Sequence, residues 1–229
     1  MKLVIVIPAY NEEAAIEHVL KSLPKKIEGI DDIISLVVDD GSTDKTAEKA
    51  SQHAGRLVQH AINLGVGAAT ITGLEAAKKL GADIVVTMDA DGQHNPKDIR
   101  RVILPILEKN VDVVVGTRMY NAEGMPKFKI FGNHMMNVMT LIVFRKWSSD
   151  SQSGMKAFNR KALRKICLHS MGYEICSEIV GEIKRNRLKH LEVPIEVLYS
   201  SYSKQKGQSW MNGVNILTKI LTIKIAGRK

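Results

Sequence analysis

The first half of the chain alternates short apolar runs with longer segments in which apolar residues recur every three or four positions. The apolar runs, rich in β-branched residues, predict strands at 3–10, 34–40, 56–60, 83–91 and 112–118. Amphipathic patterns between them predict helices at 12–22, 43–54, 66–80 and 96–109. Because the strands are apolar on both faces and are separated by helices, the pattern predicts a mostly parallel α/β sheet with helices on both faces.

The second half of the chain has a less regular pattern. The segment 125–147 carries methionines and aromatic residues between flanking bases, and a Ser-rich loop follows at 148–154. A helix is predicted near 173–186, a strand at 190–199 and a last helix ending near residue 225. Since no repeat and no linker divides the chain, we expect a single domain over residues 1–229.

Charge and composition narrow the class of partner. The hydrophobic fraction of 45% and the charged fraction of 25% are ordinary for a globular protein. A net charge of +9 favours an anionic partner, such as a nucleic acid, a nucleotide or a lipid head group. Aromatic residues make up only 5%, which argues against basic strands interleaved with aromatics that bind single-stranded nucleic acid. We therefore expect no nucleic-acid partner.

The cysteines and the apolar runs indicate a compartment. Cys167 and Cys176 form neither a CxxC motif nor a disulfide framework, which favours a reducing environment. The run after Met1 is too short and too early for a signal peptide. No apolar run reaches the roughly 18–20 residues of a membrane span. These patterns predict a soluble or peripheral protein.

Polar side chains follow four of the predicted strands. They are Tyr10 to Glu12, Asp39 with Asp40, Asp89 with Asp91, and Arg118. Ligands of open α/β sheets bind in the crevice beyond the carboxyl ends of the strands. Four strands thus direct polar groups to one edge, which predicts the functional site there.

Asp89 and Asp91 are the most informative pair at this edge. Two carboxylates at a strand end suit Mg²⁺ or Mn²⁺, which is often held by few protein oxygens and completed by water and phosphates. An acidic turn is the alternative, with Asp91 or Asn95 capping the next helix and Pro96 in its first turn. Both interpretations can hold together. His94, beside the pair, is expected to be a solvated or core residue rather than a ligand.

Two further segments have structural and functional interpretations. In 37–46, Ser42, Thr43 or Asp44 can cap the next helix, whereas Asp40 can accept hydrogen bonds from a nucleobase or ribose; the residues alone favour capping. The glycines of 63–73 fit neither GxGxxG after the first strand nor a P-loop. Gly65 and Gly67 are therefore expected to serve helix packing.

Arg118 ends the run 112–118 and faces the predicted carboxylates. It forms either a salt bridge or a phosphate clamp, and a metal and a diphosphate nearby would favour the clamp. Carboxylates, a cation and an arginine at the mouth of a parallel sheet suit a nucleoside diphosphate as leaving group. The metal and Arg118 would neutralise the charge that develops on it.

Six short motifs occur in order along the chain. They are PAYNE (8–12), VVDDGSTD (37–44), DADGQ (89–93), GTR (116–118), DSQSG (150–154) and EVPI (192–195). Together they resemble family 2 glycosyltransferases of the GT-A fold, in particular the dolichyl-phosphate mannose synthase and polyprenyl-phosphate glycosyltransferase branch, over residues 3–210. The resemblance implies inverting, metal-dependent transfer of mannose or glucose from a GDP- or UDP-sugar to a polyprenyl or dolichyl phosphate.

The resemblance also implies roles for residues of this chain. The nucleotide sugar would contact Pro8, Tyr10, Glu12, Val38, Asp40, Asp89, Ala90, Asp91 and Arg118. The metal, Mg²⁺ or Mn²⁺, would be held by Asp89, Asp91 and Gln93. The acceptor side would comprise Asp150, Ser153, Glu178, Lys204 and Lys206. The expected catalytic residues are Asp91, Arg118, Asp150 and Lys204. The nucleotide-sugar half would be 1–120, and the half that faces acceptor and membrane would be 121–229.

Two features of the acceptor side remain open at this level. After EVPI the family carries an Arg and a Lys in an R…GxSK segment; here Lys204 is near the Arg position and Trp210 stands where the Lys would be. A lipid phosphate is already an anion and needs little help from a base, whereas a hydroxyl acceptor needs one, and Asp150 is the evident candidate. The residues do not decide between these roles for Asp150.

A polyprenyl acceptor implies contact with a membrane. The segment 125–147, with Lys127, Lys129, Arg145 and Lys146 at its ends, is then expected to be an interfacial amphipathic helix; a buried helix packed on the sheet is the alternative. We expect a cytoplasmic protein, peripheral on the cytoplasmic face, with a membrane protein as a further partner. The rival functions are transfer to a saccharide hydroxyl and a non-catalytic nucleotide-binding module; the intact DAD and GTR motifs argue against the second.

Overall fold

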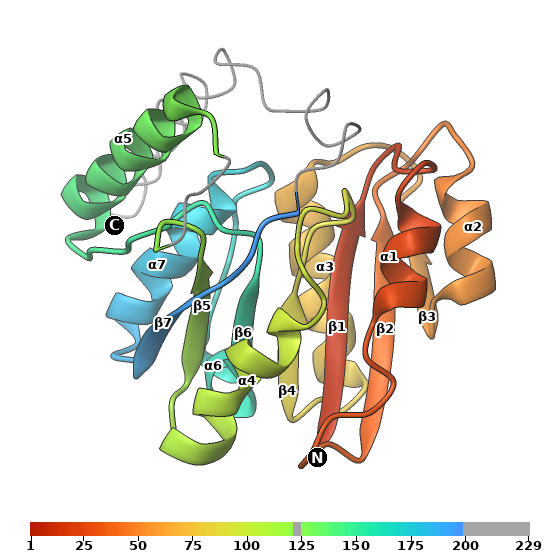
Figure 1. Cartoon of the computed structure of the whole chain (residues 1–229), viewed down its shortest axis with the longest axis horizontal. Helices are drawn as coiled ribbons and strands as arrows, with labels where there is room; N and C mark the ends of the chain where they lie inside the picture. The colour runs from red at the N-terminus through yellow and green to blue at the C-terminus, as the bar shows by residue number, and fades with distance from the viewer. Residues whose placement is uncertain (121–124, 199–229) are drawn as a thin grey trace.

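The buried, β-branched runs of the sequence form strands in the computed structural model, which describes residues 1–120 and 125–198. The described part contains one seven-stranded sheet in the order β3-β2-β1-β4-β6-β5-β7 (Figure 1). The strands are β1 Lys2–Ala9, β2 Asp32–Asp39, β3 Arg56–Gln59, β4 Ile84–Thr87, β5 Val113–Thr117, β6 Lys156–Asn159 and β7 His190–Pro194. The helices are α1 Ile16–Ser22, α2 Thr46–His53, α3 Val66–Lys79, α4 Asp98–Lys109, α5 Lys127–Phe144, α6 Arg160–Lys165 and α7 Ile175–Arg185.

The sheet is parallel except for β6, which runs antiparallel to both β4 and β5. Pro8 of β1 lies opposite Val38 of β2, and Val6 of β1 lies opposite Thr87 of β4. These strands therefore reach their carboxyl ends at the same edge of the sheet. The prediction of a mostly parallel sheet with strand ends converging on one edge is confirmed.

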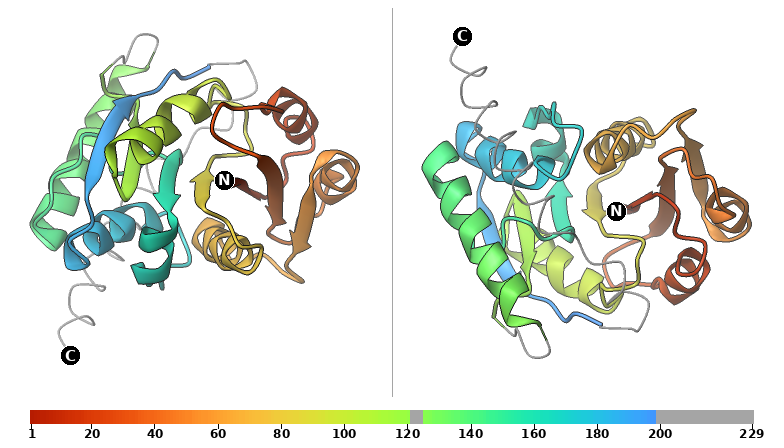
Figure 2. Two further views of the ribbon diagram at one scale, coloured as in Figure 1. Left: turned by 90° about the horizontal axis from the view of Figure 1, so that it is seen from below. Right: turned by 90° about the horizontal axis from the view of Figure 1, so that it is seen from above.

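Helices cover both faces of the sheet, as the two-sided apolar strands predicted (Figure 2). Along β1, Leu3, Ile5 and Ile7 face the core beneath α1, α2 and α4, whereas Val4 and Val6 face the core beneath α3, α6 and α7. Each fully buried aliphatic side chain of this kind contributes about 1.5–3 kcal/mol to folding. The strands at the centre of the sheet are therefore a rigid base for the loops at their ends.

The strand β6 and the helix α6 were not predicted from the sequence. The strand has only four residues, and one of them is the buried Lys156. A charged residue in so short a run interrupts the apolar pattern from which a buried strand is predicted. It pairs with β4 and β5, both from the first half of the chain, so the two halves share one sheet. Because β6 runs antiparallel to its neighbours, the Ser-rich loop before it lies at the edge where β4 and β5 end.

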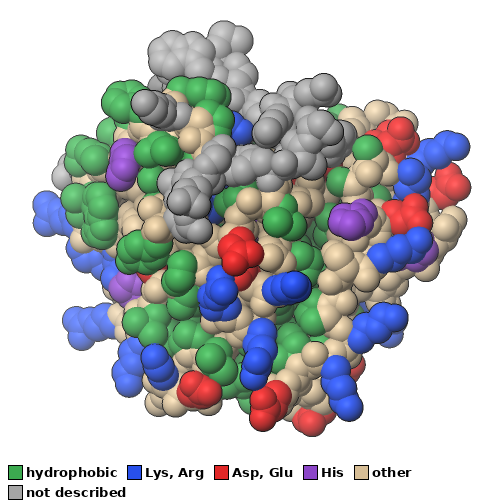
Figure 3. Space-filling view, viewed as in Figure 1, with side chains coloured by type: hydrophobic (Ala, Val, Ile, Leu, Met, Phe, Trp, Pro, Cys, Tyr) green, Lys and Arg blue, Asp and Glu red, His purple; other side chains and the backbone are tan. Residues whose placement is uncertain are grey.

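The segment predicted as either an interfacial or a buried helix forms helix α5. One of its faces packs on α7: the Thr140 and Ser177 hydroxyls are 2.8 Å apart, and a Cβ on Gly181 would lie 2.3 Å from the Phe144 ring. Its opposite face is exposed and apolar, with Phe128 and Phe131 about 70% exposed (Figure 3). The helix therefore has two apolar faces: one is buried against α7, and the other faces outward.

The remaining elements agree in part with their predictions. The strand predicted at 190–199 ends at Pro194, and the helix predicted to end near residue 225 lies outside the described residues. Within the described part of the chain, no helix combines the length and the apolar character needed to cross a bilayer.

Candidate active site

The carboxyl ends of β4 and β5 and the loop before β6 bring three predicted motifs together. Arg118 after β5 binds Asp150 of the loop, and Gly154 of the same loop lies directly against Asp89 after β4. Although the motifs DADGQ, GTR and DSQSG lie far apart along the chain, they meet at this edge of the sheet. The topology, with β6 between β4 and β5, produces this contact.

Asp89 is held from two sides and open on another. Its Oδ2 lies 3.0 Å from His94 Nε2, and a Cβ placed on Gly154 would come within 2.3 Å of both its carboxylate oxygens. Its side chain remains 46% exposed. Burial acts to raise the pKa of Asp89, but the hydrogen bond and charge of His94, with the charges of Arg118 and Lys156, outweigh it and lower this pKa. Asp89 is therefore an anion at neutral pH.

Asp91 lies beside Asp89 in the same loop. Its Oδ1 accepts a hydrogen bond from the Gln93 backbone N–H at 2.9 Å, and its Oδ2 accepts one from Gln93 Nε2 at 2.6 Å. Burial, and then the charge of Asp89, raise the pKa of Asp91 above its ordinary value. The two carboxylates thus repel each other, and a divalent cation between them would remove that repulsion.

The residues of this loop fit the predicted Mg²⁺ or Mn²⁺. Such ions take oxygen ligands and are usually bound through one or two carboxylates plus substrate phosphates. Asp89 and Asp91 supply hard carboxylate oxygens at an open strand end, whereas Gln93 turns its amide nitrogen to Asp91. Among residues 1–120 and 125–198, no group of three or more His, Cys, Asp or Glu residues is arranged to hold a metal ion. A turn is also present, because Asn95 Oδ1 accepts a hydrogen bond from the Lys97 N–H. The predicted capping of the next helix is not, since α4 begins after Lys97 without a side-chain cap and Pro96 precedes it.

Arg118 and Asp150 form a buried, bidentate ion pair. Arg118 Nε and Nη2 each lie 2.7 Å from one carboxylate oxygen of Asp150, and the Arg118 backbone N–H donates to Asp150 at 3.0 Å. Burial acts to raise the pKa of Asp150, but the charge and hydrogen bonds of Arg118 hold it below its ordinary value. Arg118 Nη1 has no hydrogen bond to any described residue, and the side chain is 20% exposed. The salt bridge considered for Arg118 is therefore present, and one guanidinium nitrogen remains for a ligand.

Glu192 holds the loop that carries Asp150, and sequence reasoning missed it. The EVPI motif was noted, but no role was given to its first residue. The Glu192 carboxylate accepts hydrogen bonds from Ser148 Oγ at 2.7 Å and from the backbone N–H and Oγ of Ser149 at 3.1 and 2.5 Å. Its position in β7, parallel to β5, places this support directly behind the Arg118–Asp150 pair.

Asp40 proves to have a structural role in addition to, or in place of, the predicted one. It is 2% exposed, and its two oxygens accept hydrogen bonds from the Leu64 and Gly65 backbone N–H groups at 3.0 and 2.7 Å. His60 Nδ1 lies 2.7 Å from the same carboxylate. Asp40 therefore fixes the loop between β3 and α3. The neighbouring Asp39 has a buried Oδ1 without a hydrogen-bond partner in the described part of the chain.

The capping and packing interpretations are realised at α2 and α3. Asp44 Oδ1 accepts a hydrogen bond at 2.9 Å from the backbone N–H of Thr46, the first residue of α2. At α3 the carbonyl of Met171 accepts from the Gly67 N–H at 2.7 Å, and a Cβ on Gly67 would lie 2.2 Å from the Ser170 carbonyl oxygen. A backbone loop thus occupies the start of α3, where a phosphate-binding helix would hold its ligand.

The other residues predicted to contact the nucleotide sugar lie at the same edge of the sheet and differ in their solvent exposure. Tyr10 is exposed at the end of β1, and Pro8 is half-buried. Val38 and Ala90 are buried. Glu12 uses its backbone to connect β1 to α2 and α1: its N–H donates to Thr46 Oγ1 at 2.7 Å, and its carbonyl accepts from the Ala15 and Ile16 N–H groups.

Two residues predicted for the acceptor side have structural roles. Both oxygens of Glu178 accept backbone hydrogen bonds, from the His169 and Ser170 N–H groups at 2.9–3.2 Å, so this buried carboxylate fixes a loop. Ser153 is also fully buried, within the turn before β6. Its Oγ accepts a hydrogen bond from the Met155 N–H, which explains the serine without an acceptor. Lys204 and Lys206 lie outside the described residues.

His94 and the buried Lys156 are the other groups that sequence reasoning did not assign. His94 was expected to be a core or solvated residue; it is buried, yet bonded to Asp89. Lys156 is 1% exposed, its ammonium donates to the Ser153 carbonyl, and its charge lowers the pKa values of Asp89 and Asp150. Only the position of β6 brings this lysine beneath the site.

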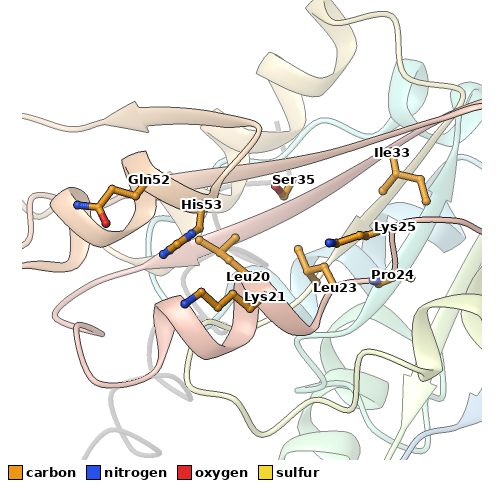
Figure 4. A pocket seen from close by; sticks show the side chains of 9 residues that line it. All are labelled: Leu20, Lys21, Leu23, Pro24, Lys25, Ile33, Ser35, Gln52 and His53. Atoms are coloured by element: carbon orange, nitrogen blue, oxygen red, sulfur yellow. The ribbon is translucent and has the colours of Figure 1, made fainter.

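A separate hollow of about 600 Å³ lies between α1, α2 and β2 (Figure 4). It is lined by Lys21, Lys25 and His53 among apolar side chains, and by Ile33 near the start of β2. The start of β2 is at the edge opposite the strand ends that carry the carboxylates. None of the predicted site residues lines this hollow, so it is not the site described above.

Comparison with known proteins gives the family context. Residues 4–167 match the family model described as glycosyl transferase family 2. The chain is 39% identical over 243 residues to the UDP-N-acetylglucosamine–dolichyl-phosphate N-acetylglucosaminyltransferase of Methanococcus voltae, an alignment that covers 96% of this chain and 95% of that protein. It is 29% identical to the dolichol-phosphate mannosyltransferase of Pyrococcus furiosus, over 94% of this chain and 61% of that protein.

Solved structures share the fold. Glucosyl-3-phosphoglycerate synthase from Mycobacterium tuberculosis, in complex with phosphoglyceric acid, superposes with a TM-score of 0.72 at 21% identity, covering 99% of this chain and 79% of that chain. The same enzyme in complex with Mn²⁺ and UDP-glucose gives a TM-score of 0.70 at 22% identity, covering 96% of this chain and 76% of that chain. The predicted GT-A fold is thereby confirmed.

Proposed function

As a member of glycosyl transferase family 2, this chain is a glycosyltransferase, and we propose that it transfers a sugar from a nucleoside diphosphate sugar to a polyprenyl phosphate, with inversion at the anomeric carbon. The observation that carries the proposal is the pair Asp89 and Asp91, two repelling carboxylates at an open strand end beside the anchored Arg118. The family membership and the names of the relatives support the acceptor class.

The donor diphosphate is proposed to bind between the carboxylate loop and Arg118. Mg²⁺ or Mn²⁺, held by Asp89 and Asp91, would supply the positive charge that stabilises the departing diphosphate. Arg118 is fixed by Asp150 through Nε and Nη2, so Nη1, which bonds no described residue, would meet a phosphate oxygen without further ordering. The fixed guanidinium and the fixed carboxylates are pre-organised for a charge that grows as the sugar bond breaks.

Asp150 is proposed to be a positioning residue rather than a general base. Each of its oxygens is bonded to Arg118, and its pKa is held low by that partner, so it is a poor proton acceptor. A phosphate acceptor is already anionic at neutral pH and attacks the anomeric carbon without losing a proton to the enzyme. This chemistry favours a lipid phosphate over a saccharide hydroxyl.

UDP-N-acetylglucosamine is the donor that we propose to test first. The Methanococcus voltae transferase, whose name specifies this donor, aligns over nearly its whole length at 39% identity. The mannosyltransferases of Pyrococcus furiosus and Micrococcus luteus align at 29% and 26%. Mannose or glucose, the sugars expected from the motifs, are then the second choices.

Attachment to a membrane surface is proposed through the outer face of α5. This face carries Phe128, Phe131, Val138 and Ile142, which are exposed, and Arg145 follows at the end of the helix. An exposed apolar stripe beside a basic residue suits the interface of an anionic bilayer. Since the inner face of α5 packs on α7, such binding needs no rearrangement of the helix.

The deciding experiment measures release of nucleoside diphosphate from UDP-N-acetylglucosamine, UDP-glucose and GDP-mannose, with Mg²⁺ or Mn²⁺. Each donor is tested with no acceptor, with a polyprenyl phosphate and with free saccharides. We expect release that requires both the metal and the lipid phosphate and that is lost in Asp91→Ala. Release that ignores the lipid but responds to a saccharide would overturn the proposed acceptor class.

The membrane proposal has its own test. Binding to vesicles that contain anionic lipid is measured by co-sedimentation at low salt, for the wild type and for Phe131→Glu. Ile62→Glu is the matched control, because Ile62 is similarly exposed, at 66%, but lies in the loop between β3 and α3. We expect Phe131→Glu to lose most binding and Ile62→Glu to keep it. Equal binding by both variants would contradict a role for α5.

A further inference from the structure

His94 is buried beneath the carboxylate loop, and the proposed reaction gives it no direct part. The residue is 3% exposed, and its Nε2 lies 3.0 Å from Asp89 Oδ2. Its Nδ1 is buried without any hydrogen-bond partner in the described part of the chain. Buried polar atoms in native proteins are nearly always paired, so a buried ring with one unpaired nitrogen requires an explanation.

Within the described part of the chain, the His94 ring makes one polar contact, and this contact indicates the role of the residue. An ionised carboxylate only accepts hydrogen bonds, so Nε2 must carry the proton that bonds Asp89 Oδ2. In a neutral ring, this places the lone pair on Nδ1, the atom without a partner among the described residues. In the described part of the chain, the imidazole is thus oriented by a single polar contact, and this contact is to a carboxylate of the proposed metal site. Asp89 Oδ1 makes no hydrogen bond to a described residue and is left for a cation.

The backbone around His94 is fastened from a distant part of the chain. His94 forms an isolated antiparallel bridge with Val197, and the Leu198 N–H donates to the Gln93 carbonyl at 2.8 Å. Asn95 Nδ2 donates to the Glu196 carboxylate at 2.9 Å, and the Glu196 N–H donates to buried Asp98 at 2.7 Å. The segment after β7 therefore fixes the loop on both sides of the histidine.

We propose that His94 is a positioning residue that holds Asp89 in the orientation for binding the divalent cation, and that the 195–198 segment keeps the ring in place. The proposal rests on the metal-dependent function proposed above and adds the residue that orients its ligand. Gly154 limits Asp89 on one side and His94 ties one oxygen on another, so the carboxylate has little freedom before the cation arrives. Outer partners of metal ligands commonly change metal affinity or activity by about 10–100-fold when removed.

The test compares two amide substitutions that differ in reach. In His94→Gln the amide nitrogen reaches the former position of Nε2, whereas in His94→Asn it reaches only that of Nδ1. Binding of Mn²⁺ is measured by electron paramagnetic resonance in the presence of saturating UDP, and thermal melting is recorded for each variant. We expect His94→Asn to weaken Mn²⁺ binding about 10–100-fold and His94→Gln to recover most of the loss, although the two variants melt at similar temperatures.

The outcomes separate this inference from the proposed function. If the wild type binds Mn²⁺ and His94→Asn binds it equally well, the positioning role is overturned and the proposed function stands. If the wild type binds no Mn²⁺ with UDP, the positioning role is overturned, and the release assay of the proposed function, which includes Mg²⁺ and GDP-mannose, decides that function separately. If neither variant folds, the histidine nitrogen spectrum of the wild type decides: a proton on Nε2 supports the proposal, and a ring protonated on Nδ1 alone overturns it.

Discussion

Two strands of the sheet end in a pair of aspartates, and the protein uses the two pairs differently. After β2, Asp40 is 2% exposed, and its oxygens accept two backbone hydrogen bonds and bond His60. After β4, the Asp89 side chain is 46% exposed, and among the described residues only one of its oxygens has a hydrogen-bond partner. Asp40 completes the fold, and Asp89 keeps bonding capacity for a ligand.

The difference shows what distinguishes a structural carboxylate from a functional one. Both pairs follow buried strands, and both lie at the same edge of a parallel sheet. The two sites differ in the backbone N–H groups near the carboxylate. The loop between β3 and α3 donates backbone hydrogen bonds to Asp40, whereas Gly154 packs against Asp89. Saturated hydrogen bonds stabilise the folded chain, and unsatisfied oxygens attract cations.

The largest expected effect comes from exchanging one aspartate for asparagine at each strand end. Asp89→Asn removes charge from the proposed metal site and is expected to lower kcat/KM about 10³-fold, about 4 kcal/mol, with little change in stability. Asp40→Asn leaves backbone donors poorly paired and is expected to cost about 2 kcal/mol of unfolding free energy. Sugar-transfer assays and urea denaturation of both variants check this. A loss of stability in Asp89→Asn that matches Asp40→Asn would erase the distinction.

Asp150 should behave as a structural carboxylate despite its place in the site. Removing one partner of a buried ion pair is expected to make Asp150→Asn less stable by about 3 kcal/mol at pH 7. Because the folded-state pKa of Asp150 is below its ordinary value of 3.8, its contribution is complete above that value and disappears as pH falls through the lower folded-state pKa. The difference in stability between wild type and variant should therefore shrink on acidification.

Urea denaturation from pH 7 to pH 3 measures that difference. Glu28→Gln is the control, since Glu28 and its partner Arg100 are both largely exposed and such pairs contribute little. A constant difference across this range would show that the charge of Asp150 is not what stabilises the fold. Full activity of Asp150→Asn with lipid phosphate would support the absence of a general base.

Replacing glycine by alanine should also distinguish the region around Asp89 from the start of α3. A Cβ at Gly154 meets the movable carboxylate of Asp89 at 2.3 Å, so Gly154→Ala is expected to lower kcat/KM about 50-fold. A Cβ at Gly67 meets backbone atoms of 170–172, which cannot yield, so Gly67→Ala should lose about 2 kcal/mol of stability. Gly132→Ala is the control, because no described atom outside its own stretch of helix lies within 4 Å of its Cβ position. If Gly154→Ala loses stability but keeps activity, Asp89 does not need its present position.

The smallest expected effect concerns Glu192 behind the Asp150 loop. Glu192→Gln replaces one acceptor oxygen with a donor that faces the donors of Ser148 and Ser149. The expected cost is about 1 kcal/mol, which corresponds to about 2–4 °C in melting temperature for a chain of this size. Calorimetry checks it against Glu108→Gln, an exposed residue of α4. An unchanged melting temperature would mean that the loop carrying Asp150 does not depend on Glu192 for its stability.

The sequence by itself determined the class of fold and the edge that carries the site. Apolar runs on both faces of a strand must be buried on both faces, and helical patterns between them leave a parallel sheet as the solution. The polar residues after β1, β2, β4 and β5 followed from the same alternation. These conclusions depend on local periodicity, which neighbouring residues fix.

Only the tertiary structure decided what each polar residue does. Asp40 and Glu178 carry carboxylates like Asp89 and Asp91, but backbone donors from other segments occupy their oxygens. Likewise, β6 brings Gly154 against Asp89, and the 195–198 segment fixes His94 beside it, although both segments lie far along the chain. Hydrogen-bond saturation depends on which segments meet in space, and a pattern read along one chain does not contain that information.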